Sequence, residues 1–194
     1  MKNNLLSLSI ALFSITASQS QNSDLPYYQI PDYPEEYNQG TVVARMVDGL
    51  GFRYFWATEG LRDEDLAYKA SEEGRTSAET IDHLYGLTKV ILNSALKLSN
   101  TGGDDGEMTF TEKRAKTLQM LKQAADIFRS SKDLSEFTVV LVRGENSSEF
   151  PFWNQINGPI ADALWHCGQI VLLRRASGNP FNSNVSVFSG KLRQ

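Results

Sequence analysis

Four long segments with the apolar spacing of helices constrain this chain more than any other feature of its sequence. Each is about 20 residues long, near the upper end of ordinary globular helices. One short run, 138–143, has the composition of a strand, and we interpret residues 145–157 as a loop. A single strand cannot form a sheet layer, so the pattern predicts an all-α four-helix bundle with a short extended segment before the last helix. The predicted helices span residues 41–61, 76–100, 108–131 and 157–176.

Polar residues at the ends of these segments indicate where helices begin and stop. Thr76, with Glu79 three positions later, has the pattern of a capping box. Thr109 or Thr111 can cap the third helix. Residues 100–106, rich in Gly, Asp and Asn, predict the loop between the second and third helices.

The N-terminus has the features of a secretory signal. Lys2 gives a short positive region, residues 5–17 form an apolar run, and small residues follow. The apolar run is shorter than the roughly 20 residues of a membrane span. We therefore predict a signal peptide over residues 1–20, an exported protein that is periplasmic or secreted, and no membrane span once the signal is removed.

Length and charge narrow the remaining possibilities. The 194 residues suggest one domain, which we place at 39–180, with an extended arm at 21–38 and a polar, irregular tail at 181–194. A net charge of −4 with scattered basic residues argues against nucleic-acid binding. Cys167 is the single cysteine, so no internal disulfide can form, and we predict that it is a small buried apolar residue.

The last predicted helix poses a problem of charge. Residues 160–173 are apolar on nearly all sides, which predicts a buried or interface helix, yet Asp162, His166 and Gln169 share one stripe. A buried carboxylate without a partner is unfavourable by several kcal/mol. Asp162 therefore needs either an ion pair with His166, four positions on, or a metal ion that both side chains hold.

The only other histidine, His83, lies on the apolar stripe of the second helix and is expected to face the interior. His83, Asp162 and His166 would then form a two-histidine, one-carboxylate set contributed by two packed helices. Such a set suits a divalent first-row ion, with zinc, nickel, iron and manganese as candidates. The alternative is that each polar group is simply hydrogen-bonded within the core.

A resemblance supports the metal interpretation. The motifs His83-Leu-Tyr-Gly-Leu and Asp162-Ala-Leu-Trp-His166-Cys-Gly-Gln-Ile resemble the DinB-like superfamily over most of residues 40–178. The family includes bacterial damage-inducible proteins and transferases that use bacillithiol or mycothiol. The resemblance implies a four-helix bundle, frequently dimeric, with a metal held by one histidine of the second helix and an H-x-x-x-H pair of the last. His83 and His166 match two of these positions, whereas Asp162 replaces the middle histidine. This substitution adds a negative charge and favours a harder ion, or marks a site that has decayed.

Other residues are secondary candidates for a pocket beside the site. Glu59, at the end of the first helix, is either a further ligand or general base, or a solvated side chain. Tyr85 and Trp165 line the pocket or belong to the core. Gln169 is another secondary candidate for this pocket. Arg174 and Arg175 suit the negative end of the last helix, with binding of an anionic substrate as the alternative.

Two functional hypotheses follow. The first is an exported DinB-like protein that binds a divalent metal, either as a metal-dependent hydrolase or transferase of a small molecule or without catalysis. Export argues against the thiol-transferase chemistry, because low-molecular-weight thiols are mainly cytoplasmic. The second is a non-catalytic, dimeric structural or binding module in which Asp162 and His166 form a buried ion pair. Both hypotheses predict a homodimer.

Overall fold

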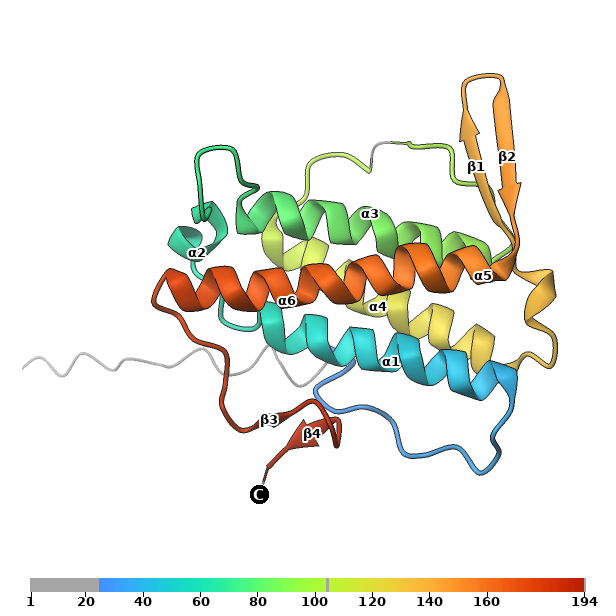
Figure 1. Cartoon of the computed structure of the whole chain (residues 1–194), viewed down its shortest axis with the longest axis horizontal. Helices are drawn as coiled ribbons and strands as arrows, with labels where there is room; N and C mark the ends of the chain where they lie inside the picture. The colour runs from blue at the N-terminus through green and yellow to red at the C-terminus, as the bar shows by residue number, and fades with distance from the viewer. Residues whose placement is uncertain (1–24, 104, 194) are drawn as a thin grey trace, which may run out of the picture.

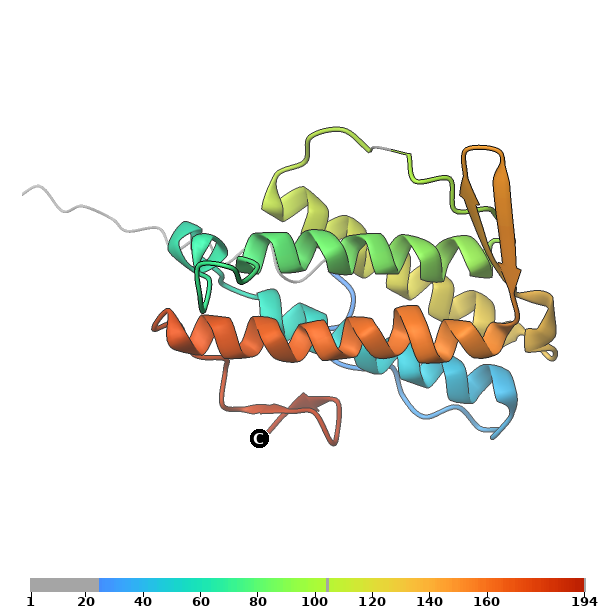
Figure 2. The ribbon, with the colours of Figure 1, turned by 45° about the horizontal axis from the view of Figure 1, so that its top comes forward.

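A computed structural model describes residues 25–103 and 105–193, so the predicted signal peptide lies outside the described residues. Four long helices pack as a ring in which α1 contacts α4 and α6, and α3 contacts the same two helices (Figures 1 and 2). No helix within the described ranges is long and apolar enough to cross a membrane. The helices are α1 (Gln39–Thr58), α2 (Asp63–Ala67), α3 (Ser77–Ala95), α4 (Phe110–Ser130), α5 (Phe152–Gln155) and α6 (Ala161–Ala176), with the short 3-10 helix η1 at Leu134–Glu136.

The ends of the long helices follow local capping chemistry. Thr76 accepts a hydrogen bond from the Glu79 backbone while the Glu79 carboxylate accepts one from the Thr76 backbone, so the predicted capping box is confirmed. Thr109, not Thr111, caps α4 in the same way. Asn38 forms a third box at the start of α1 that we did not predict. Each box satisfies backbone N–H groups that a helix start leaves unpaired.

The predicted all-α fold class is wrong, because the chain also contains two small antiparallel sheets. Strands β1 (Val139–Arg143) and β2 (Asn146–Phe150) form a hairpin that projects from one end of the helical core (Figure 1). Arg143 pairs with Asn146 across a tight turn in which Gly144 has a φ of 59°, a conformation that favours glycine. Residues 146–150, which we interpreted as loop, thus provide the partner of the predicted strand.

The second sheet corrects the prediction of an irregular C-terminal tail. Strands β3 (Val185–Ser186) and β4 (Lys191–Leu192) pair within that tail. The Ile30 amide of the N-terminal arm donates to the Gly190 carbonyl at 2.8 Å. A hydrogen bond therefore joins the two ends of the described chain.

The last predicted helix is preceded by a change of winding. α5 leads through a π-helical turn, η2 (Ile156–Ile160), into α6. Pro159 lies inside this turn, where it cannot donate a backbone hydrogen bond. The wider turn changes the direction in which the side chains of the following residues point. π turns of this kind occur frequently beside functional sites.

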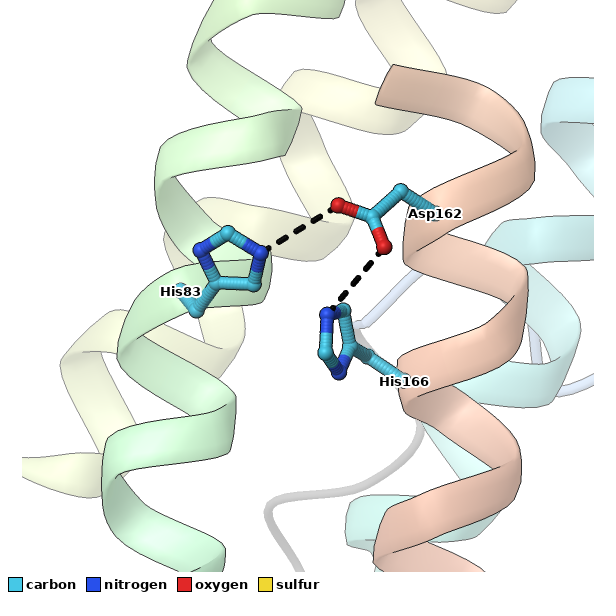
Figure 3. Close-up of side chains that lie close together, drawn as sticks. All are labelled: His83, Asp162 and His166. Atoms are coloured by element: carbon cyan, nitrogen blue, oxygen red, sulfur yellow. Dashed lines mark hydrogen bonds and ion pairs between the residues drawn. The ribbon is translucent and has the colours of Figure 1, made fainter. Parts of the chain in front are cut away.

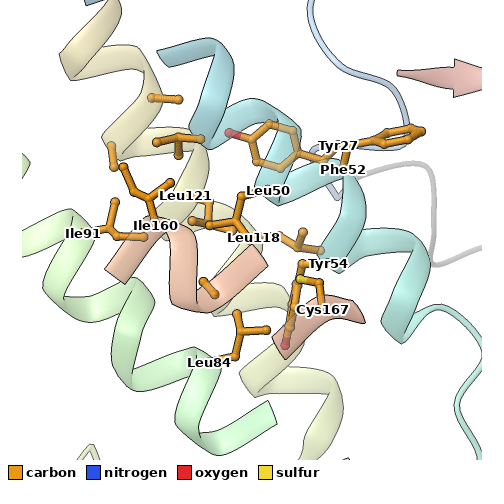
Figure 4. Close-up of a cluster of buried hydrophobic side chains, with 14 of the residues drawn as sticks. Tyr27, Leu50, Phe52, Tyr54, Leu84, Ile91, Leu118, Leu121, Ile160 and Cys167 are labelled. Carbon is orange, nitrogen blue, oxygen red and sulfur yellow. The ribbon is translucent and has the colours of Figure 1, made fainter. Parts of the chain in front are cut away.

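The core is centred on α1, which is apolar on nearly all sides because helices, arm and tail surround it (Figure 4). Tyr27 of the arm packs so closely on Gly51 that a Cβ atom there would lie 2.4 Å from its ring. The Tyr27 hydroxyl donates to the buried Asp48 carboxylate at 3.2 Å, and Arg129 of α4 donates to the same carboxylate at 3.1 Å. The largest fully buried apolar side chains include Leu50, Phe52, Tyr54, Leu84, Ile91, Leu118, Leu121, Ile160 and Ile170.

Candidate metal centre

The structure brings together the three side chains predicted as metal ligands. His83 on α3 and the pair Asp162 and His166 on α6 point towards one another across the contact between these helices (Figure 3). His83 Nε2 lies 3.3 Å from Asp162 Oδ2, and His166 Nε2 lies 3.2 Å from Asp162 Oδ1. The two imidazole rings meet edge to face, with their centroids 4.6 Å apart. One carboxylate thus bridges two imidazoles.

The separations are compatible with a single ion. Each residue offers one ligand atom, and these three atoms lie within 4.8 Å of one another. Two ligand atoms of a tetrahedral zinc site are about 3.3 Å apart, given metal–ligand bonds of about 2.0 Å. The two nitrogen–oxygen contacts involve different oxygens of Asp162, so around an ion held by one carboxylate oxygen the ligand atoms would need to approach one another by at most about 1.5 Å. The group could therefore hold a metal ion.

Gln169 fixes the orientation of one imidazole. Its Oε1 lies 2.6 Å from His166 Nδ1, one helical turn further along α6. With Gln169 Oε1 as the acceptor, Nδ1 carries a proton, and Nε2 of the neutral ring keeps a lone pair that could bind a metal ion; a ring protonated on both nitrogens would instead donate to Asp162. Metal-binding histidines in proteins are commonly oriented by such a partner on the second ring nitrogen.

The site lies at the surface of the helical core and not deep within it. The His166 side chain is 12% exposed, whereas those of His83 and Asp162 are 36% and 41% exposed. We predicted that the last helix is a buried or an interface helix, and complete burial is wrong, because Trp165 and Leu172 are largely exposed. Partial exposure lowers the desolvation cost of the carboxylate and leaves the group open to solvent on one side.

Two of the secondary candidates are engaged elsewhere. Glu59 forms an ion pair with Arg114 at 2.7 Å, and the Arg114 guanidinium also donates to the Thr58 hydroxyl. The Tyr85 hydroxyl donates to Asp105 at 2.7 Å in the loop between α3 and α4. Neither residue joins the histidine group. Across the described ranges, no fourth His, Cys, Asp or Glu completes it.

Cys167 lies beside His166 but faces the other way, into the core. The residue is 2% exposed, as predicted for a small apolar side chain. Burial raises the pKa of the Cys167 thiol to about 12, so the reactive thiolate is scarce at neutral pH.

Native protein at pH 8 should therefore react with a thiol reagent such as dithiobis-nitrobenzoate at least 100-fold more slowly than protein unfolded in urea. Absorbance at the wavelength of the released chromophore measures both rates. Equal rates in the two states would show that the thiol is accessible and ionised in the folded chain.

The sequence analysis did not predict the hydrogen-bond network that Arg62 and Asp65 form. Asp65 of α2 is fully buried and accepts hydrogen bonds from Arg62, Ser177 and Asn179. The signal was an acid three positions after an arginine at a helix start, which resembles a capping box with a cation in the cap position. The network connects α2 to the end of α6, and so fixes one end of the helix that carries Asp162 and His166.

Comparison of the chain with protein-family models, with curated proteins and with solved structures gives no match. The resemblance to the DinB-like superfamily stays a prediction based on its short motifs.

Proposed function

We propose that this chain is a DinB-like protein that binds a divalent transition-metal ion through His83, Asp162 and His166. The observation that carries the proposal is the convergence of two Nε2 atoms on one carboxylate, from helices whose ligands are 79 positions apart in sequence. Two imidazoles and one carboxylate leave coordination positions free on most first-row ions. Zinc, nickel, iron and manganese are the candidate ions.

In the enzymatic form of this proposal, a bound ion would supply Lewis acidity to a small-molecule substrate, as in metal-dependent hydrolases and transferases. The protein's part is to hold the ligands and to leave the group accessible from one side. The partly exposed His83 and Asp162 side chains meet that requirement. Residues 1–20 are predicted to be an export signal, and export agrees better with hydrolysis than with thiol transfer. Measuring the intact mass of the chain recovered from a periplasmic fraction tests whether the signal is removed and the chain exported.

Metal content of the purified full chain tests metal binding. Mass spectrometry should find about one ion per chain in the wild type and none above background in His166→Ala. Asp63→Ala, which removes an exposed carboxylate of α2, is the control and should retain the ion. A wild type that stays metal-free after incubation with each candidate ion would refute the proposal.

Gln169→Ala should weaken metal binding by about 10- to 100-fold, because the His166 ring loses the acceptor that sets its tautomer. Gln169→Glu retains an acceptor at the same position and should restore most of the affinity. Competition with a chromophoric chelator measures all three affinities. If alanine and glutamate at this position behave like glutamine, His166 is oriented by other contacts.

A second candidate function is a non-catalytic structural module. The Asp162 carboxylate lies within 3.3 Å of each of the two imidazoles, so the group can satisfy its own polar atoms. On this alternative, replacing Asp162 and His166 together by leucine should preserve folding and assembly. Loss of a metal-dependent property in that double variant, with folding intact, would favour the metal site instead.

We also propose that the chain forms a homodimer through the exposed face of α6. Trp165 and Leu172 are 72% and 64% exposed, one on either side of Gly168, and no Lys or Glu occurs between them. Sedimentation velocity should show a dimer for the wild type and a monomer for Trp165→Glu. Trp153→Glu changes an equally exposed tryptophan on α5 and should leave the dimer intact.

A further inference from the structure

A cavity of about 460 Å³ lies between α6 and the C-terminal tail, on the side of α6 away from the histidines. Leu164 and Val171 of α6 form one apolar wall, and Phe181, Val185 and Val187 of the tail form the other. Its volume falls within the roughly 300–1,000 Å³ of small-molecule sites. None of the three candidate metal ligands lines it, so this cavity is separate from the metal centre.

The tail that covers the cavity is held at both ends. At one end, Asn179 donates to the Asp65 carboxylate at 2.6 Å, and its carbonyl accepts from Arg174 at 2.8 Å. At the other end, the Gly190 carbonyl accepts from the Ile30 amide of the arm. The segment between these anchors carries the apolar wall, so the space beneath it is a feature of the fold and not a gap under a loose terminus.

Two guanidinium groups border the apolar walls. Arg53 of α1 donates to the Gly49 carbonyl at 3.0 Å, and its side chain carries further N–H donors. Arg175 of α6 is exposed at the edge of the cavity. Within the described part of the chain, neither arginine forms an ion pair with a carboxylate.

The neighbouring Arg174 shows what an arginine with a structural role does in this fold. Arg174 is buried and donates to the Trp56 and Ala57 carbonyls at the end of α1. It therefore caps the end of α1, whereas we predicted that this pair of arginines suits the end of the last helix itself. Arg175 has no such partner in the described residues and is available to a ligand.

We propose that this cavity binds a single-chain amphipathic anion, a free fatty acid, with its carboxylate between Arg53 and Arg175 and its alkyl chain along the apolar walls. The planar guanidinium matches a carboxylate in charge and in hydrogen-bond geometry. The apolar walls favour an alkyl chain over water, because burial removes apolar surface of both partners from solvent. A small hydrophilic anion would leave those walls unfilled.

Calorimetric titration of the full chain with dodecanoate, below its micellar concentration, tests the proposal. We expect saturable one-to-one binding, at least tenfold weaker binding of dodecanol, and at least tenfold weaker binding of dodecanoate to the double variant Arg53→Gln, Arg175→Gln. Arg143→Gln changes an exposed arginine at the end of β1 and should bind as the wild type does. Equal affinity in all these proteins, or no saturable binding, would overturn the proposal.

A variant that fills the cavity separates ligand exclusion from loss of folding. Gly168 lines the cavity, and a Cβ atom there would meet nothing within 4 Å. Gly168→Leu should therefore fill the cavity and block ligand binding. The protein should still fold, because the substitution replaces glycine, which is unfavourable within helices. Gly86→Leu makes the same change at an open position of α3 and should leave binding unchanged. Dodecanoate binding that survives Gly168→Leu would contradict the assignment. A protein that binds anionic phosphatidylglycerol vesicles but not free dodecanoate would also contradict it.

Discussion

Zinc at a thousand times its dissociation constant should raise the free energy of unfolding by about 4 kcal/mol, because the ion binds the folded chain far better than the unfolded one. Only folding brings His83 to Asp162, which lies 79 positions away, whereas the unfolded chain keeps just the local pair of Asp162 and His166. Urea unfolding with and without zinc, followed by circular dichroism, measures this difference.

Variants of the site show whether the added stability arises at the predicted ligands. His83→Ala and His166→Ala should each lose most of the zinc increment, since removing one ligand of three weakens binding severely. Both histidines of the chain belong to the site, so a control must come from the carboxylates, and Asp63→Ala should keep the full increment. An increment that persists in both histidine variants would place the zinc elsewhere.

Asp65→Ala should reduce the free energy of unfolding by about 3 kcal/mol, near the lower end of the range for breaking a buried ion pair. The Asp65 side chain is fully buried, and Arg62 donates to it from both Nε and Nη2 at 2.9 Å. Ser177 and Asn179 donate to the same carboxylate at 2.5 and 2.6 Å. Arg62 is itself 47% exposed and can be hydrated again, which keeps the expected loss at the lower end.

The same carboxylate predicts a pH dependence. Hydrogen bonds, above all from Arg62, hold the pKa of the Asp65 carboxyl well below its usual range. A lowered pKa in the folded state adds stability that is present above the unfolded value of about 3.9 and is lost as the pH falls towards the folded value. The difference in urea midpoint between wild type and Asp65→Asn should therefore be large at pH 7 and smaller at pH 3.

Two observations would contradict this role of Asp65. One is an Asp65→Ala variant as stable as Asp63→Ala, which removes an exposed acid from the same short helix. The other is a difference between wild type and Asp65→Asn that grows as the pH falls below 4. Either would show that α2 is attached to the end of α6 by contacts other than this carboxylate.

The helices could be predicted because their determinants are local. Apolar spacing and the pair of Thr76 and Glu79 act within one or two helical turns, so they can be recognised in the sequence before the fold is known. β2 was missed because four of its five residues are polar and all five are exposed, and only its pairing with β1 makes it a strand. The tail hairpin was missed because its strands have only two residues each, and its hydrogen bond with Ile30 of the arm joins distant parts of the chain.

The candidate site was predictable for a different reason. The chain contains two histidines, and helical spacing pointed each of them towards a neighbouring helix. The expected burial of His83 and Asp162 was wrong, because their side chains are 36% and 41% exposed. The roles of Glu59 and Tyr85 could not be predicted in this way. Their partners, Arg114 and Asp105, come from other segments, and no local pattern reveals a contact between distant parts of a chain.

Anomalous diffraction from crystals of the zinc-treated protein tests the central claim most directly. A peak at the zinc edge should lie about 2.0–2.2 Å from His83 Nε2, His166 Nε2 and one oxygen of Asp162. Absence of a peak between α3 and α6, or a zinc ion held there by other side chains, would contradict the metal centre proposed for this protein.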